Sequence, residues 1–425
     1  MAVPRPSYGW YGDDFTGATD TLATLAQGGM RALLFLGLPS QRNLLAAGPL
    51  DAIGIAGASR AMPPAEMAVE LDAVGRFFAE LKIGLLHYKC CSTFDSSPHI
   101  GSIGAAVRAL RPHVRPGPVP VVGGQPNLGR YCIFGNLFAA AGSNGIVHRI
   151  DRHPTMSVHP VTPMREADLR RHLALQGLDP VGLIDHRAYE GDVHSHWLAD
   201  MEAEAIVLDI ICARDIAAIG ALLARLGGDG PLLAVGPSSV AQAFVAASGN
   251  APGAPVVAPP ARDKAGHILA LVGSLSPVTR LQVETASGYA KTMIDPLRLI
   301  SDGDYRENLR SAVVEQLASG HVMLSTNRPE GTPGNPGDVA VATAALLRAI
   351  VDKVRPSRLV VAGGDTSSRA IQAMDIWGLS YEAAFVTGAP NCRAHSDSAS
   401  LDGLSVILKG GQVGPNDFFN MAAKL

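Results

Sequence analysis

Short apolar runs alternate with amphipathic stretches along almost the whole chain. An uninterrupted apolar run of about four to eight residues predicts a buried strand, and apolar positions at i, i+4 and i+7 predict a helix with one buried face. Residues 267–273 (HILALVG) show the first pattern, while Ala18, Leu22 and Leu25 show the second. We therefore expect an α/β fold, with mostly parallel or mixed sheets flanked by helices.

The chain of 425 residues exceeds the roughly 250–300 at which a single core usually divides, so we expect two domains. Residues 246–266 (AASGNAPGAPVVAPPARDKAG) are rich in Ala, Pro and Gly and contain few large apolar side chains. Such a segment buries little surface and is typical of a linker. The sequence thus predicts an N-terminal domain at 1–245, a linker at 246–266 and a C-terminal domain at 267–425.

The amino-acid composition excludes some classes of binding partner. The formal net charge is −3, with 47% hydrophobic and 17% charged residues, which argues against binding to nucleic acid. The five cysteines include no C-x-x-C pair, and no long uncharged apolar stretch occurs. We expect a cytoplasmic protein with reduced thiols and no association with membranes. The sequence leaves a homodimer open.

In open α/β sheets, ligands bind beyond the carboxyl ends of strands, where loops enter helices. Four such strand-to-helix corners carry unusual residues. The first, residues 7–29, places Asp13 and Asp14 between a strand and a helix that ends at Gly28-Gly29. Capping of the helix would explain one aspartate. The second carboxylate favours a ligand role, most simply hydrogen bonding to the hydroxyl groups of a polyol.

The second corner follows the strand in residues 84–88 (GLLHY). Lys89 comes directly after this strand, where a cation could meet a carboxylate, and Ser92 offers a hydroxyl group. A surface lysine beside a serine-rich turn is the competing interpretation. Ser97 and Pro98 predict the N-cap and first turn of the next helix.

The third corner follows the strand at 267–273. Ser276 and Pro277 predict a capped helix whose free N–H groups attract anions. The hydroxyl groups of Ser274 and Ser276 could add hydrogen bonds to a phosphate, although every α/β protein also needs capped helices.

The fourth corner follows a β-branched strand with Gly363 and Gly364, and then Asp365 and Thr366 open a helix. Paired glycines let a backbone approach a ligand closely, and successive N–H groups can bind an anion. A second such pair, Gly410-Gly411, ends a strand near the C-terminus and could line the same nucleotide.

The carboxylate of Asp365 suggests chemistry beyond phosphate binding. A carboxylate near an acceptor hydroxyl is the expected base in phosphorylation, while Mg²⁺ offsets the phosphate charge. A helix cap is the simpler alternative. No set of ligands for a metal held by the protein alone is predicted, since His194 and His196 lack a clear third ligand.

No Walker, protein-kinase or G-x-G-x-x-G motif occurs. Six segments together resemble instead the four-carbon acid sugar kinase family, in the expected order across essentially the whole chain. They are GDDFTGATD, KCCSTFDSSPHIGSIG, HPVTPMREADLRRHL, VGSLSPVTRLQV, VAGGDTSSRAI and LKGGQVGPNDFF.

The resemblance implies ATP-dependent phosphorylation of an acid such as threonate, erythronate or 3-oxo-tetronate. It implies an N-terminal domain that holds the acid, a C-terminal domain that holds ATP, and an active site in the cleft between them. By the same resemblance, the residues expected to contact the acid are Asp13, Asp14, Lys89 and Ser92. Those expected around the nucleotide are Ser274, Ser276, Gly363, Gly364, Asp365, Thr366, Gly410 and Gly411.

One departure from the family pattern concerns the acceptor. Many members have Ser-Thr-Leu-Arg-Gly-Asn where this chain has residues 92–97 (STFDSS), so an arginine that could hold a carboxylate in a bidentate manner is missing. A branched or five-carbon oxo-acid, such as 3-oxo-isoapionate, is therefore a rival substrate. A non-catalytic sensor of sugar acids and nucleotides is the alternative function, and an oxidoreductase or isomerase of the same acids is a third.

Overall fold

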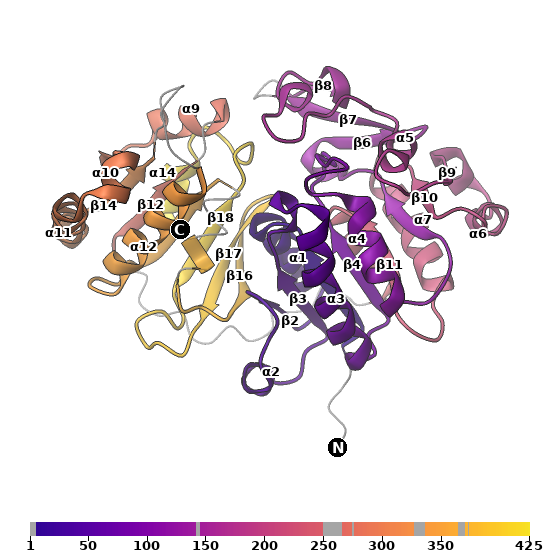
Figure 1. The fold of residues 1–425 in the computed structure, drawn as a ribbon, viewed down its shortest axis with the longest axis horizontal. Coiled ribbons are helices and arrows are strands. Elements are labelled where there is room, and N and C mark those ends of the chain that lie inside the picture. Colours follow the sequence, from indigo (N-terminus) through magenta and orange to yellow (C-terminus); the bar gives the residue numbers. More distant parts are fainter. Residues whose placement is uncertain are drawn as a thin grey trace. The chain divides into compact units, whose positions relative to one another are not determined.

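The computed structural model describes residues 6–141, 145–249, 266–273, 276–326, 336–363, 370–372 and 374–425. The chain forms two compact units, Met1–Val256 and Val257–Leu425 (Figure 1). Each unit is a sheet flanked by helices, which confirms the predicted α/β class. Residues 250–265 of the predicted linker lie outside the described residues, and residues 246 and 247 belong to a helix.

The sheet of the first unit is parallel throughout the described pairs of strands. In spatial order the strands are β2 (Ala32–Phe35), β3 (Ala52–Ala56), β1 (Tyr8–Gly12), β4 (Leu85–Lys89), β11 (Leu232–Gly236), β5 (Val119–Val122), β10 (Ala205–Leu208) and β9 (Val181–Ile184). Every residue of β1, β4 and β11 is buried, which explains why these strands are apolar or glycine at every position except His87 and Lys89.

Helices flank this sheet on both faces. The long ones are α1 (Phe15–Gln27), α3 (Pro64–Leu81), α4 (Ile103–Leu110), α7 (Ala213–Arg225) and α8 (Ser239–Ala247), and the short ones are α2 (Gln41–Ala47), α5 (Leu169–Ala174) and α6 (Val193–Leu198). α1 leads from β1 toward the β2 edge, whereas α3 leads from β3 to β4 in the opposite direction. Because parallel crossovers are right-handed, these two helices cover opposite faces. α8 packs with α1 and α7, and α4 packs with α3.

A small antiparallel sheet is inserted after β5. It consists of β6 (Arg130–Ile133), β7 (Asn136–Ala141) and β8 (Ile146–Arg149). The buried carboxylate of Asp209, just after β10, accepts hydrogen bonds from the backbone N–H groups of Phe134 at 2.6 Å and Gly135 at 2.9 Å. These bonds fix the turn between β6 and β7 against the end of the parallel sheet.

The second unit has a mixed sheet. Its strands in spatial order are β13 (Tyr289–Met293), β14 (His321–Ser325), β12 (Ile268–Val272), β15 (Arg358–Ala362), β18 (Ser405–Lys409), β17 (Ala389–His395) and β16 (Gly378–Val386). The described pairs from β13 to β18 are parallel, and β17 is antiparallel to both of its neighbours. The helices whose bounds fall within the described residues are α9 (Pro277–Thr285), α10 (Pro296–Ser301), α11 (Gly303–Ser319), α12 (Pro336–Val351) and α14 (Phe418–Lys424).

One predicted helix start is wrong. α4 begins at Ile103 with Ser102 as its N-cap, five residues after the predicted start at Pro98. The hydroxyl group of Ser97 does accept a hydrogen bond from the backbone N–H of Ile100, at 3.0 Å, but it caps only a turn. Gly101 then adopts a φ of +61°, which is incompatible with continuation of a right-handed helix.

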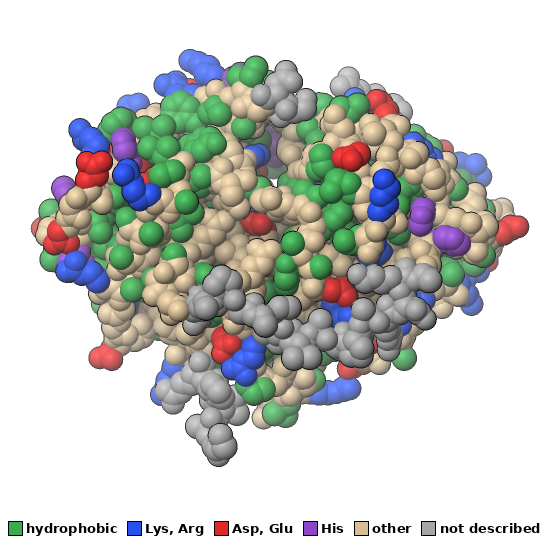
Figure 2. Space-filling model, turned by 180° about the vertical axis from the view of Figure 1, so that it is seen from behind, with side chains coloured by type: hydrophobic (Ala, Val, Ile, Leu, Met, Phe, Trp, Pro, Cys, Tyr) green, Lys and Arg blue, Asp and Glu red, His purple; other side chains and the backbone are tan. Residues whose placement is uncertain are grey.

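Among the residues that the structure describes, no helix is long and apolar enough to cross a bilayer. Figure 2 shows acidic and basic side chains interspersed over the face that it presents.

Candidate functional site

The carboxyl ends of three adjacent strands, β3, β1 and β4, form one edge of the first sheet. Hydrogen bonds continue beyond the strands: the N–H of Gly57 donates to the carbonyl of Gly12 at 2.9 Å, and the N–H of Asp13 donates to the carbonyl of Lys89 at 3.0 Å. The corner after β3 therefore lies beside the two corners predicted from the sequence. We call this part of the molecule the acid edge, defined by Asp13, Asp14, Arg60, Lys89 and residues 90–96.

Asp14 is the N-cap of α1. Its Oδ1 accepts a hydrogen bond from the backbone N–H of Gly17 at 2.6 Å, and its Oδ2 accepts one from the hydroxyl of Thr16 at 2.9 Å. Removal of such a cap typically costs about 1 kcal/mol. Capping thus explains why an aspartate occupies position 14. Asp13 is equally buried and needs another partner for its charge.

That partner is Arg60, which sequence analysis missed. Its Nε and Nη2 donate to the two carboxylate oxygens of Asp13 at 3.0 and 2.7 Å, and its Nη1 donates to Oδ2 of Asp14 at 2.6 Å. Arg60 follows β3 by four residues, in the segment GASR. The sequence signal that could have found it is a charged residue in the loop that follows a buried strand, as at the other corners.

The two aspartates differ electrostatically. Burial raises the pKa of Asp13, although the charge of Arg60 opposes this shift. Burial alone would also raise the pKa of Asp14, but the charges of Arg60 and Lys89 and the hydrogen bond from Gly17 outweigh it, so this pKa lies below its ordinary value. Asp14 is therefore a carboxylate at neutral pH, able to accept further hydrogen bonds from hydroxyl groups.

Lys89 lies over the first turn of α1, where Gly17 provides the room. A Cβ atom on Gly17 would lie 2.6 Å from Nζ of Lys89 and 2.7 Å from Oδ1 of Asp14, closer than real atoms approach. The lysine side chain is buried, and its Nζ donates a hydrogen bond to the carbonyl of Cys90 at 2.8 Å. The structure thus brings Lys89 to the two predicted aspartates.

The loop after β4 contributes Ser92, which is buried and whose hydroxyl group bonds to no other described residue. The hydroxyl of Thr93 donates to the carboxylate of Asp95 at 2.5 Å. Ser96 is held by two residues of a distant segment: its hydroxyl lies 2.9 Å from Nε2 of His172 and accepts a hydrogen bond from the side-chain amide of Gln176 at 2.8 Å. The loop conformation is therefore set by internal hydrogen bonds, with Ser92 available to a ligand.

In the second unit, the carboxyl ends of β12, β15 and β18 are adjacent. The N–H of Gly273 donates to the carbonyl of Ala362 at 2.9 Å, and the N–H of Gly363 donates to the carbonyl of Lys409 at 2.7 Å. Gly363 has a φ of +120°, which side chains rarely adopt. We call this part the glycine edge, defined by Ser276, Thr279, Gly363 and residues 409–411.

The third predicted corner joins this edge. Ser276 caps α9 by accepting a hydrogen bond from the N–H of Thr279 at 3.1 Å, as predicted. Its hydroxyl group also donates to the carbonyl of Gly411, as does that of Thr279 at 2.8 Å. These bonds attach the segment after β18 to the start of α9.

Lys409 is a second residue that the sequence did not single out. It is fully buried, and its Nζ donates to the carbonyl of Gly410 at 2.9 Å and to the hydroxyl of Thr279 at 3.0 Å. Burial lowers its pKa to about 7. No carboxylate of the described residues pairs with it, so its only partners are neutral oxygens and the face of the Phe418 ring.

Four predicted nucleotide-site residues lie outside the described residues: Ser274, Gly364, Asp365 and Thr366. In the part of the chain that is described, no group of three or more His, Cys, Asp or Glu side chains is arranged to hold a metal ion.

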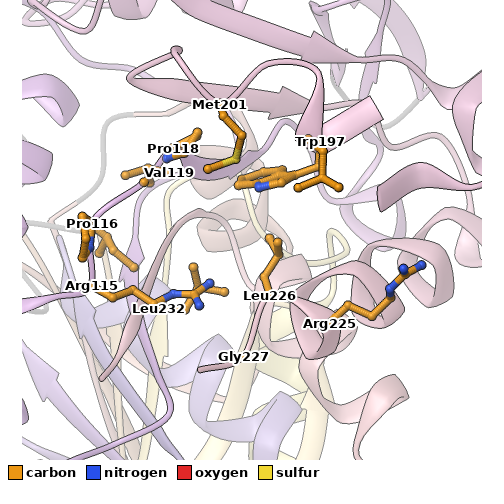
Figure 3. A pocket seen from close by; sticks show the side chains of 13 residues that line it. Arg115, Pro116, Pro118, Val119, Trp197, Met201, Arg225, Leu226, Gly227 and Leu232 are labelled. Atoms are coloured by element: carbon orange, nitrogen blue, oxygen red, sulfur yellow. The ribbon is translucent and has the colours of Figure 1, made fainter. Parts of the chain in front are cut away.

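A pocket of about 210 Å³ lies elsewhere in the first unit. It is formed near Val119 and Leu232, where β5 and β11 begin, and so at the opposite end of the strands from the acid edge. Figure 3 shows the side chains of Trp197 and Met201 facing that of Leu226 across it.

Comparison with known families matches both units. Residues 8–244 match a family model described as a sugar-binding N-terminal domain, and residues 269–419 match one described as a nucleotide-binding C-terminal domain. The chain belongs to the four-carbon acid sugar kinase family. The family indicated by the six sequence segments is thus confirmed, and the acid edge lies within its sugar-binding domain.

Curated relatives in this family span nearly the whole chain. A 3-oxo-isoapionate kinase of Paraburkholderia graminis is 38% identical, covering 97% of this chain and 93% of the relative. A 3-oxo-tetronate kinase of Pseudomonas fluorescens is 31% identical, covering 99% and 97%. Among solved structures, a candidate tRNA synthase from Salmonella typhimurium LT2 superimposes with a TM-score of 0.78 at 24% identity, over 98% of both chains. The last likeness shows the fold alone.

Proposed function

We propose that this chain transfers the γ-phosphoryl group of ATP to a hydroxyl group of a 3-oxo sugar acid, with 3-oxo-isoapionate as the first candidate and 3-oxo-tetronate as the second. The observation that carries the proposal is the 38% identity to a 3-oxo-isoapionate kinase along 97% of the chain. The two family matches support the same division of labour, with one unit for a sugar acid and the other for a nucleotide.

The acid edge supplies the groups that a polyhydroxy acid needs. Asp14 is ionised and can accept hydrogen bonds from substrate hydroxyls, while Lys89 and Ser92 can donate hydrogen bonds. Asp13 holds Arg60, so we assign it to the support of Asp14 as much as to contact with the substrate.

The glycine edge suits a phosphate chain. Gly363 adopts a positive φ and Gly410 has no close neighbour beyond ordinary contact, so the backbone can approach a ligand. Ser274, Gly364 and Thr366 stay predictions for the same site. The nucleotide would enter as its Mg²⁺ complex, because Mg²⁺ is usually held by phosphates and one or two carboxylates.

In the transfer, the acceptor oxygen forms a bond to the γ-phosphorus, the bond to the β,γ-bridging oxygen breaks, and ADP leaves. The hydroxyl proton needs an acceptor, for which we propose Asp365. The interdomain cleft predicted for this reaction also stays a prediction.

The test is release of ADP by the wild type and two variants with a panel of tetronates and 3-oxo acids. We expect turnover that requires both Mg²⁺ and a sugar acid, and near-complete loss in Asp365→Asn. Asp375→Asn, an exposed acid ten residues further on, is the matched control and keeps wild-type turnover. Binding of ATP and acids without turnover would support the sensor alternative instead.

A further inference from the structure

Arg130 stands out among the cations near the acid edge because none of the carboxylates that the structure describes neutralises it. It begins β6, directly after the turn that follows β5. Backbone hydrogen bonds between Arg130 and Gln125, at 2.9 and 3.2 Å, hold it at the carboxyl end of β5. The side-chain amide of Gln125 donates a hydrogen bond to the carboxylate of Asp20 in α1 at 3.0 Å. This bond attaches the turn to the helix that Asp14 caps.

The guanidinium group of Arg130 is poorly satisfied by the protein. Its Nη1 donates to the carbonyl of Leu128, and its Nε is buried without any hydrogen-bond partner. Among the described residues no carboxylate lies within 4.0 Å of it, in contrast to Arg60 with two. An unpartnered buried donor of this kind destabilises the folded chain, and a bound anion would remove that penalty.

The groups that surround Arg130 do not neutralise its charge. Burial lowers its pKa, and the thiol of Cys91 in the loop after β4 is close enough to oppose that shift. His153 also lies near Arg130, but an imidazole ring is neutral or cationic and cannot neutralise it. Arg130 is therefore a free positive charge beside a loop, residues 90–97, that contains no arginine of its own.

We propose that Arg130 binds the carboxylate of the sugar acid, as the specificity-determining cation of the first unit. Arg60 cannot take this role, because three of its N–H groups are already bonded to Asp13 and Asp14. Lys89 lies against Asp14 and donates to a backbone carbonyl, which suits hydroxyl recognition better. The planar guanidinium of Arg130 can present Nε and Nη2 together to the two oxygens of a carboxylate.

The inference rests on the proposed function, and a thermodynamic cycle separates the two. Binding of 3-oxo-isoapionate and of its uncharged primary amide is measured by calorimetry for the wild type, Arg130→Met and Arg130→Lys. We expect Arg130→Met to weaken acid binding by about 100-fold and amide binding by less than threefold. Arg130→Lys, which keeps one charge but not the fork, should fall in between. The KM for ATP should stay within twofold.

Arg115→Met is the matched control. Arg115 is another arginine whose pKa burial lowers, and it lines the pocket at the opposite end of the strands. Its replacement should leave acid binding within twofold of the wild type. Equal losses for acid and amide in Arg130→Met, or unchanged acid binding, would overturn the inference while leaving the kinase proposal intact. Failure of the wild type to bind any acid of the panel would overturn both.

Discussion

The guanidinium group of Arg60 holds the carboxylate of Asp13 through two hydrogen bonds, at 3.0 and 2.7 Å, from a different strand corner of the same sheet edge. A third bond at 2.6 Å reaches Asp14. Because both aspartates are buried, this arginine is what allows two negative charges to lie side by side.

Replacement of Arg60 by Met should therefore destabilise the first unit strongly. Removal of one member of a buried ion pair typically costs about 3–5 kcal/mol, since the partner is left buried and uncompensated. Urea unfolding monitored by fluorescence measures the effect. Arg31→Met serves as the control, because the more exposed Arg31–Asp51 pair should be worth about 1 kcal/mol or less. Equal losses in the two variants would contradict this account of the edge.

Gly17→Ala tests the placement of Lys89. The added methyl group would meet Nζ of Lys89 at 2.6 Å, so the lysine must move while the helix itself is favoured by alanine. We expect the KM for the acid to rise by about tenfold and the KM for ATP to stay unchanged. Gly303→Ala, at the first position of α11 with its nearest neighbour at 3.7 Å, should leave both constants unchanged. An unaltered KM for the acid in Gly17→Ala would show that Lys89 does not contact it.

The burial of Lys409 predicts that the free energy of unfolding depends on pH in the alkaline range. Its pKa of about 7 in the folded chain lies below its ordinary value of 10.5, so between these values the unfolded chain holds a proton that the folded chain lacks. Unfolding free energy should then rise with pH in that window, by up to about 1.4 kcal/mol per pH unit. Lys409→Met should remove this contribution, whereas Lys291→Met, at an exposed lysine, should not. A slope that survives in Lys409→Met would refute the assignment.

The burial of His87 predicts that stability also depends on pH in the acid range. The hydroxyl of Tyr8 lies 2.8 Å from its Nδ1, and its Nε2 lies 2.8 Å from the carbonyl of Gly236, so Nε2 carries the proton of a neutral ring. Burial lowers its pKa to about 3 from an ordinary value of 6.5.

The unfolded chain therefore binds a proton at His87 between pH 6.5 and 3 that the folded chain refuses, and stability should fall as pH falls through this window. His87→Gln should flatten that part of the curve measured by chemical unfolding, and His99→Gln, at an exposed histidine, should leave it unchanged. Identical acid limbs in the wild type and His87→Gln would disprove the assignment.

Much of this arrangement could be predicted from the sequence. The parallel strands β1, β4, β12, β15 and β18 are short and mostly apolar, and the corners after them carry unusual polar residues or paired glycines. Neighbouring parallel strands end at the same edge, so Asp13 lies close to Lys89 once the structure shows that β1 and β4 are neighbours. The cap of α9 at Ser276 followed from the Ser-Pro pair alone.

What the sequence did not reveal depends on contacts between distant segments. Arg130 and Lys409 became notable only through their partners or the lack of them, and the ion pairs of Arg60 could not be read from its position after a strand. Nothing local distinguishes Arg60, with its two carboxylates, from Arg130, with none. The start of α4 was misplaced because a capped turn at Ser97 resembles a capped helix over its first four residues.

Phosphorylation of a 3-oxo sugar acid is tested by the regiochemistry and yield of product when the wild type is incubated with Mg²⁺, ATP and 3-oxo-isoapionate or 3-oxo-tetronate. We predict one equivalent of ADP for each equivalent of a monophosphorylated acid, with 3-oxo-isoapionate the better substrate, and no product from Asp365→Asn. ADP release that does not depend on any acid of the panel, or no product with either 3-oxo acid, would contradict the account.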